Sequence, residues 1–196
     1  LTHDTVSENK TAKIGEIVEF KIMFDVPQLS IGSSDHTVWI SDTMDSGLAI
    51  QTETISVKGI PLAGDETALT MGTDYAVNPD PALPGTEGSS FVVSFNNYES
   101  ISDYAQIVIT YSAEVTANAA DTIADAVGIR NTAKLHYYTN GSPASPIEAD
   151  VILYTYGIEV TKTGDNSEAL SGATFKLYVD EGNGVQEDNI IEFMDT

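Results

Sequence analysis

The chain contains no cysteine and very few basic residues, and both absences limit what it can do. Without cysteine it forms no disulfide, offers no thiolate to a metal ion and has no cysteine nucleophile. Its 8 lysines and arginines stand against 30 aspartates and glutamates, which gives a formal net charge of -22. A chain this acidic repels nucleic acids and anionic lipid surfaces, so we expect it to bind neither. It also lacks any run of about 20 apolar residues, the length that a membrane-spanning helix requires.

The apolar residues that are present predict a β-rich fold. Hydrophobic residues make up 41% of the chain, which is too many for a disordered polypeptide. They alternate with polar residues in short runs separated by turn-forming segments, a pattern typical of half-buried strands. The predicted strands are residues 17–24, 36–41, 52–58, 90–95, 105–115, 131–138 and 149–156. The fold class that follows is all-β, with immunoglobulin-like β-sandwich domains.

Three segments interrupt the strands. Residues 42–47 form a polar turn after the second strand, and residues 78–88 form a loop because prolines and glycines recur throughout them. Residues 117–126 predict either a short helix or a loop insertion.

A domain boundary is predicted between residues 156 and 157. Residues 1–156 form the first domain, and residues 157–196 begin a second one. The second segment holds about three strands, too few to close a sandwich, so we expect that domain to be incomplete in this chain. Almost no linker separates the two, which favours domains stacked in tandem.

The second segment opens with two short alternating strands, Gly157-Ile-Glu-Val-Thr-Lys162 and Leu170-Ser-Gly-Ala-Thr-Phe-Lys-Leu-Tyr178. Lys162 shares a face with the apolar residues, where an uncompensated ammonium group is costly. The segment resembles the start of the B-type repeat domain of Gram-positive collagen adhesins and pilins. That resemblance implies that Lys162 forms an intramolecular isopeptide bond; without it, Lys162 is an ordinary edge lysine.

The first 156 residues resemble the A-type adhesin-like domain of a sortase-assembled backbone pilin. The matching segments are residues 12–22, 40–48, 109–115 and 131–137. In that family a lysine on the first strand joins an asparagine on the last strand, assisted by a buried acid. The resemblance assigns Asn131 as the acceptor and Asp42 as the acid. His3 stands at the lysine position, and Lys10 and Lys13 are nearby alternatives.

Burial explains why this chemistry needs these residue types. A buried amine is neutral and therefore nucleophilic, and a buried carboxylic acid is protonated and can polarise the amide that is attacked. The reaction releases ammonia once within one chain, so the protein is not expected to be an enzyme. Asp42 and Asn131 also have simpler interpretations, as a turn-capping residue and as a residue that begins a strand.

The resemblance implies a structural shaft subunit of a covalently assembled pilus. Its partners are other pilin subunits joined by a sortase, and its location is extracellular, on a cell-wall-anchored pilus. An alternative is an adhesin stalk or tip module that binds host matrix proteins or glycans. A third class, a β-sandwich glycosidase, needs two facing carboxylates in a cleft. No cofactor or metal is expected, because the three histidines are scattered and the acidic turns lack calcium-loop spacing.

Overall fold

The computed structural model describes residues 1–7, 9–29, 37–79, 82–95, 97–122, 127–139, 141–156, 177–178 and 190–191. The chain divides into two units, Leu1–Gly157 and Ile158–Thr196. Within the described part of the second unit, β12 (Leu177–Tyr178) pairs antiparallel with β13 (Ile190–Ile191). Lys162 and the motif around it lie outside the described residues. A search of the described residues for a helix long and apolar enough to cross a membrane found none.

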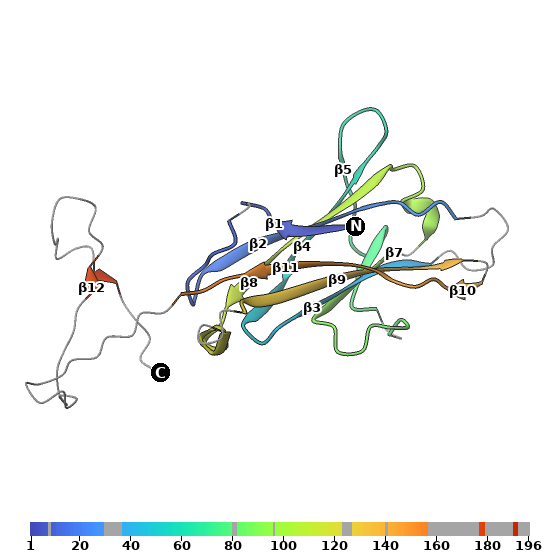
Figure 1. Cartoon of the computed structure of the whole chain (residues 1–196). Coiled ribbons are helices and arrows are strands. Elements are labelled where there is room, and N and C mark those ends of the chain that lie inside the picture. The colour runs from blue at the N-terminus through green and yellow to red at the C-terminus, as the bar shows by residue number, and fades with distance from the viewer. Residues whose placement is uncertain are drawn as a thin grey trace, which may run out of the picture. The chain divides into compact units, whose positions relative to one another are not determined.

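The first unit is a sandwich of two antiparallel sheets (Figure 1). The first sheet has the order β1-β2-β8-β4-β5, and the second has the order β10-β9-β3-β7-β6 with β11 also paired to β9. The strands of the first sheet are β1 (Thr2–Thr5), β2 (Ile17–Asp25), β8 (Gln106–Val115), β4 (Leu48–Ile60) and β5 (Thr67–Ala68). Those of the second are β10 (Ser142–Pro143), β9 (Ile129–Thr139), β3 (Val38–Met44), β7 (Phe91–Phe95), β6 (Tyr75–Val77) and β11 (Ile147–Leu153). The predicted all-β sandwich is confirmed.

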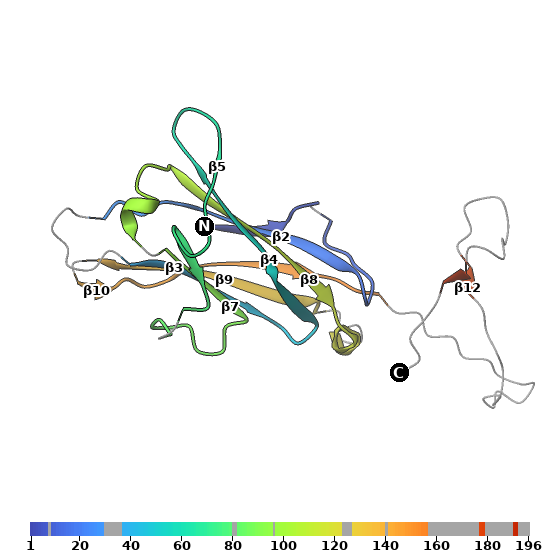
Figure 2. The same cartoon turned by 180° about the vertical axis from the view of Figure 1, so that it is seen from behind.

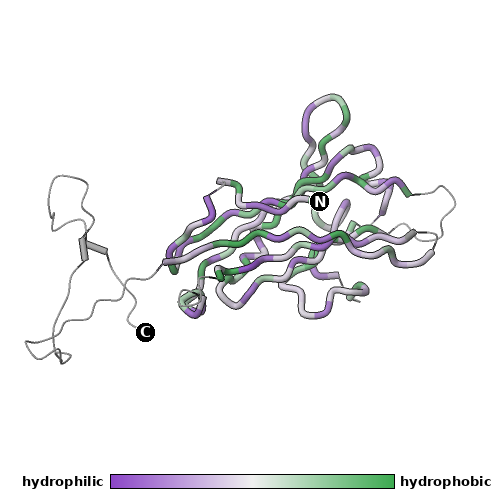
Figure 3. The backbone as a smooth tube through the Cα atoms, viewed as in Figure 1, coloured by the Kyte–Doolittle hydropathy of each residue, from purple (hydrophilic) through white to green (hydrophobic). Residues whose placement is uncertain are grey.

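Alternation of side chains builds the core between the sheets, and Figure 3 shows it as changing hydropathy along the strands. On β2, Val18, Phe20, Ile22 and Phe24 are buried while the residues between them are more exposed. The central strand β8 follows the same rule. Each large apolar side chain that is fully buried contributes about 1.5–3 kcal/mol. Hydrophobic burial therefore holds the long strands together.

The two sheets meet along one side of the sandwich, where β1 packs against β11 (Figure 1). The chain that follows β1 then joins the end of β11 through its backbone. The N–H of Tyr154 donates to the carbonyl of Lys10 at 2.7 Å, and the N–H of Ala12 donates to the carbonyl of Tyr154 at 3.0 Å. The β4–β5 hairpin projects from the sandwich, as both the first view and the view from behind in Figure 2 show. The first strand of the unit thus lies close to strands of both sheets.

Several predicted boundaries differ from the structure. Strand β4 begins at Leu48 and not at residue 52, and β11 ends at Leu153 and not at residue 156. Strand β3 continues through Asp42 to Met44, so the turn predicted over residues 42–47 begins later, at Asp45. The prediction was wrong there because β7 and β9 pair with this segment and hold it extended. Within 117–126, Ala117–Thr122 forms a 3-10 helix and residues 123–126 lie outside the described residues. A second 3-10 helix spans Tyr98–Ser100.

Candidate functional site

Four polar side chains from four strands meet in the core of the first unit. They are His3 on β1, Asp42 on β3, Tyr111 on β8 and Asn131 on β9, and we call them the buried polar cluster. Asp42 and Asn131 are fully buried, and the side chain of His3 has no exposed surface. Two of these strands belong to the first sheet and two to the second. The cluster therefore connects the two layers of the sandwich.

Strand register explains why these side chains meet. On neighbouring strands, Asp42 pairs with Ala133 and Met44 pairs with Asn131. Asp42 and Asn131 are therefore diagonal neighbours on one face of the sheet. In the other sheet, buried and more exposed residues alternate along each strand. His3 on β1 and Tyr111 on β8 are both at buried positions of this alternation, so both point inward.

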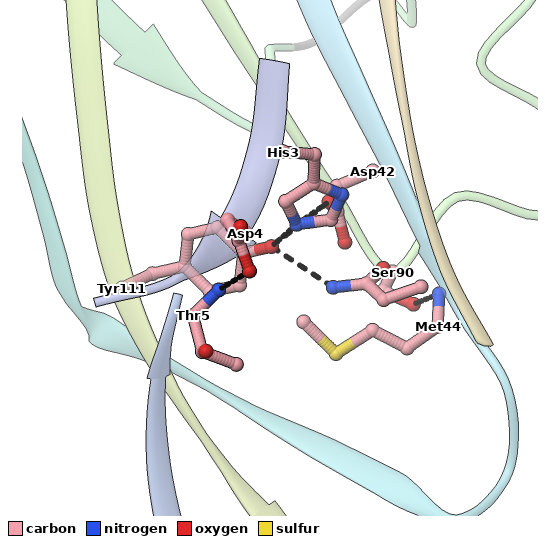
Figure 4. Close-up of polar contacts among 8 residues, drawn as sticks. His3, Asp4, Thr5, Asp42, Met44, Ser90 and Tyr111 are labelled. Atoms are coloured by element: carbon pink, nitrogen blue, oxygen red, sulfur yellow. Dashed lines mark hydrogen bonds and ion pairs between the residues drawn. The ribbon is translucent and has the colours of Figure 1, made fainter. Parts of the chain in front are cut away.

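The hydroxyl of Tyr111 lies at the centre of the cluster (Figure 4). It lies 2.7 Å from Nε2 of His3 and donates to Oδ2 of Asp42 at 3.0 Å. The amide Nδ2 of Asn131 donates to the same hydroxyl at 2.9 Å. Nε2 of His3 is 3.7 Å from Oδ2 of Asp42, so the tyrosine hydroxyl connects the two titratable groups.

Aromatic rings surround this hydroxyl. Phe20 stacks on Tyr111 with ring centres 5.5 Å apart, and Phe91 meets it edge-on at 4.8 Å. The imidazole of His3 lies 6.1 Å from the ring of Phe20. These apolar walls keep the local dielectric low, which favours the uncharged form of each titratable group.

The pKa values follow this environment. Burial raises the pKa of Asp42 to about 8, although hydrogen bonds from Tyr111 and Asn131 act in the opposite direction. Burial lowers the pKa of His3 to about 4, outweighing the backbone at Ala149 and the nearby carboxylates, which favour the cation. Burial and the neighbouring Asp42 also raise the pKa of Tyr111 well above its ordinary value. Near neutral pH the aspartate is therefore protonated and the histidine is neutral.

Unsatisfied atoms support the same protonation state. Oδ1 of Asp42 and Oδ1 of Asn131 are buried acceptors with no hydrogen-bond partner, and Nδ1 of His3 also has none. A buried acceptor without a donor costs about 1–3 kcal/mol. A proton on Asp42 would supply a hydrogen-bond donor to a cluster in which two acceptors, Oδ1 of Asp42 and Oδ1 of Asn131, have no donor.

The structure brings together three of the residues that the sequence singled out. Asp42 and Asn131 share the cluster with His3, which occupies the place that the pilin resemblance gives to a lysine. Asn131 lies on β9, which β10 and β11 follow, so it is not on the last strand. The turn-capping interpretation of Asp42 was wrong, because its carboxyl group lies inside the core.

Lys10 lies elsewhere. Its side chain is 48% exposed, and its ammonium group pairs with Asp4 at 3.2 Å. Lys13 is also exposed. The structure therefore does not bring either lysine to the fully buried Asn131. The sequence analysis overlooked Tyr111, although its position signals it: the residue stands at an inward phase of the long strand predicted over residues 105–115.

The outer face of the second sheet holds a separate aromatic group under the loop of residues 82–90. Trp39 stacks on His136 with parallel rings 5.1 Å apart, and Ser41 bonds to His136 at 2.9 Å. A groove of about 290 Å³ runs beside them. Trp39 is only 1% exposed, so it packs beneath the loop. Among the described residues, no group of three or more His, Asp or Glu side chains could hold a metal ion.

Comparison with known proteins places this fold. No protein-family model matches the chain. Over 198 residues the chain is 25% identical to the trypsin-resistant surface T6 protein of Streptococcus pyogenes serotype M6. That match covers 90% of the chain but 35% of the T6 protein, so the chain spans about a third of the relative's length.

Solved structures show the same likeness. The T6 backbone pilin of serotype M6 Streptococcus pyogenes matches with a TM-score of 0.53 and 20% identity, over 78% of the chain and 33% of the pilin. The group B streptococcus pilus 2b backbone protein matches with a TM-score of 0.54 and 17% identity, over 95% of the chain and 73% of that structure. The predicted resemblance is confirmed: in sequence and in fold, the chain is similar to part of the backbone pilins of Gram-positive bacteria.

Proposed function

We propose that the chain is part of a structural shaft subunit of a pilus on a Gram-positive cell surface. The similarity to the T6 protein extends over 90% of the chain and supports this role. The first unit would be an A-type pilin domain and the second unit the start of a B-type domain. Other pilin subunits, linked covalently by a sortase, would be its partners on a cell-wall-anchored pilus. The role is structural, so no cofactor or catalytic turnover is involved.

The buried polar cluster is the observation that carries this proposal. Asp42 and Asn131 both bind the hydroxyl of Tyr111 in the core, which supports the roles that the pilin resemblance implies for them. The third position holds His3, whose imidazole is a poor substitute for an amine because an acyl-imidazole is readily hydrolysed. In the first unit, hydrogen bonds would therefore replace the covalent tie. Lys162 remains the proposed isopeptide lysine of the second unit.

Assembly on the cell surface tests the shaft role. Cell-wall extracts of the source bacterium, boiled in detergent and probed with antibodies raised against this chain, should give a ladder of covalent polymers. A ladder that disappears when the sortase gene is deleted would support the shaft role. A single band of monomer size would overturn it. Signal confined to the largest species would favour the alternative, a tip adhesin that contacts host matrix proteins or glycans.

Intact mass tests the proposed state of the cluster separately. The purified first unit should have its sequence mass, with no loss of ammonia, because His3 cannot condense with Asn131. A loss of one ammonia would show that a lysine reaches Asn131 after all. Substituting Lys10→Ala and Lys13→Ala would then identify which lysine reacts.

A further inference from the structure

Strand β1 is held to the sandwich mainly by polar groups. It is only four residues long, Thr2-His3-Asp4-Thr5, and it pairs with β2 along one edge. Its two buried side chains are His3 and Thr5, and the hydroxyl of Thr5 donates to the carbonyl of Asn9. Within β1 no apolar side chain lies in the core, and Leu1, directly before it, is only partly buried against the core, so β1 depends strongly on the contacts of His3. Short edge strands with few apolar contacts are the parts of a fold that open locally at the lowest free energy.

His3 and Asp42 titrate as a coupled pair, because the same hydroxyl contacts both of them. The hydroxyl of Tyr111 touches both Nε2 of His3 and Oδ2 of Asp42. One proton can therefore lie on the aspartate with a neutral histidine, or on the histidine with a charged aspartate. Both arrangements suit the same heavy-atom positions, because the tyrosine hydroxyl can donate in either direction. In either case the docked pair holds a single shared proton.

We propose that His3, Tyr111 and Asp42 form a reversible clamp that takes up one proton when β1 docks at neutral or mildly alkaline pH, so that β1 is held most firmly in mild acid and loosens in mild alkali. This deepens the proposed role of the cluster as a non-covalent substitute for an isopeptide bond. The biological role of the clamp rests on the proposed function. The clamp itself depends only on side chains of the first unit.

Other charged groups near His3 do not remove this effect. Asp4 on β1 and Asp150 on β11 both favour a charged imidazole, and both carboxylates are partly or fully exposed. Asp4 is also partly neutralised by its pair with Lys10. From β8, β3 and β9, the groups that face His3 are Tyr111, Asp42 and the neutral Asn131. Neither exposed carboxylate lies between the two members of the pair.

Linkage gives the direction of the pH dependence. The raised pKa of Asp42, about 8, means that its contribution to docking is complete below its ordinary value of 3.8 and is lost as the pH rises through 8. The lowered pKa of His3, about 4, means that its contribution is complete above 6.5 and is lost as the pH falls from 6.5 toward 4. Between about pH 4 and 6.5 the two opposite slopes cancel, since docking moves one proton from histidine to aspartate.

Above pH 6.5 only the aspartate contributes. An open strand that exposes Asp42 to water leaves both groups unprotonated, whereas the docked pair still holds a proton until about pH 8. A difference of one proton changes an equilibrium constant tenfold per pH unit. The docking equilibrium should therefore weaken between pH 5.5 and pH 9, by at most roughly 20- to 30-fold, the factor reached when the lifting of β1 exposes Asp42 fully to water.

Native-state hydrogen exchange on the purified chain tests this clamp. Protection factors, which correct for intrinsic exchange rates, should be measured for β1 and for β8 from pH 5 to 9. We expect the protection of β1 to be level near pH 5–6 and then to fall as the pH rises, by no more than the factor above. Protection of β1 that does not change with pH would overturn the proposal.

Two variants make the test independent of overall stability, because each should change the pH dependence of β1 protection in a different way: one reverses its sign and the other removes its level region. Asp42→Asn keeps the hydrogen-bonding shape but removes the titrating acid, so β1 protection should rise between pH 5.5 and 7.5 as His3 loses its proton. His3→Gln removes the base, so protection should fall from pH 5 upward without the level region. Equal slopes in the three proteins would refute a shared proton, whatever their stabilities. The other two histidines are common to all three proteins, so their titration cancels in the comparison.

The result is independent of the ladder experiment on cells, so one proposal can fail while the other stands.

Discussion

Substituting His3→Lys should convert the clamp of the first unit into a covalent cross-link. The new amine would enter a fully buried site that holds Asp42, whose pKa of about 8 keeps it protonated, and the carboxamide of Asn131. Burial would favour the neutral, nucleophilic form of the lysine. The amine nitrogen would attack the carboxamide carbon, and ammonia would leave with the proton relayed through the acid. The product is an amide that ties β1 to β9.

The expected stabilisation is large because the closed loop is long. The bond would join residues 3 and 131, a loop of about 130 residues, and the chain-entropy argument used for disulfides gives about 5 kcal/mol for loops of this size. Tyr111 opposes the reaction, since its hydroxyl lies 2.7 Å from Nε2 of His3 and 2.9 Å from Nδ2 of Asn131, between the two groups that must meet. Adding Tyr111→Phe removes that hydroxyl, and the double variant should react faster than the single one.

Intact-mass spectrometry is the assay. His3→Lys should lose the mass of one ammonia, and denaturant unfolding should move to higher concentration. Matched controls are His3→Lys with Asn131→Ala, which removes the acceptor, and His3→Lys with Asp42→Ala, which removes the acid; both should keep their full mass. A folded His3→Lys protein with unshifted mass, in both the Tyr111 and the Tyr111→Phe backgrounds, would refute the assignment of this cluster as an isopeptide site.

Two further substitutions test the frame around the cluster. Gly128 has a φ of +71°, and an added Cβ would lie 2.5 Å from a side-chain carbon of Ile152. Gly128→Ala should therefore lower the free energy of unfolding by about 2 kcal/mol, measured by urea titration. An unchanged urea midpoint would contradict the backbone conformation at Gly128. Thr54→Val should cost about 1–3 kcal/mol, because the hydroxyl of Thr54 accepts the backbone N–H of Ser112 at 2.8 Å. Thr52→Val, at an exposed position of the same strand, is the control and should be neutral within about 0.5 kcal/mol.

Alternation of apolar and polar residues was enough to predict most of the long strands. On β2 the residues Val18, Phe20, Ile22 and Phe24 alternate without a break, because one face of this strand meets the core and the other faces outward. Local pattern succeeds wherever one face of a strand is buried, since the side-chain period of two then appears directly in the sequence. The loop over residues 78–88 was recognisable for a different reason, because its prolines cannot join a ladder.

Local pattern failed at Asp42, and the failure has a physical cause. The polar run from Asp42 to Gly47 resembles a turn, yet its first three residues belong to β3. What keeps Asp42 extended is tertiary: its backbone pairs with β7 and β9, and its carboxyl group accepts a hydrogen bond from Tyr111, 69 residues away. Only the resemblance to pilins pointed to a buried acid there. No local propensity encodes a partner at that separation.

The phase of its strand signals that Tyr111 points inward, but its polar partners could not be predicted because they depend on the register between strands. Tyr111 lies opposite an irregularity in β4, where the pairing shifts between Gln51 and Ser56. Thr54 in this bulge takes the backbone bond of Ser112 that the ladder would otherwise satisfy. Bulges re-aim side chains and often flank functional sites. Their position is set by pairing between strands and not by the sequence of either strand alone.

The buried polar cluster also fixes the pairing register of β1, which hydrophobic burial alone cannot fix. With the sequence Thr2-His3-Asp4-Thr5, the strand has no apolar side chain whose burial could distinguish one register from another. A slip of one residue would turn His3 outward and place Asp4 or Thr2 in the core, where neither would meet Tyr111. Such a slip would break the 2.7 Å contact between the hydroxyl of Tyr111 and Nε2 of His3, which links β1 to β8. The polar contact therefore selects one register for the strand, even where its net contribution to stability is small. A lysine bonded covalently to Asn131 would fix the register permanently, whereas His3 fixes it only while β1 is docked.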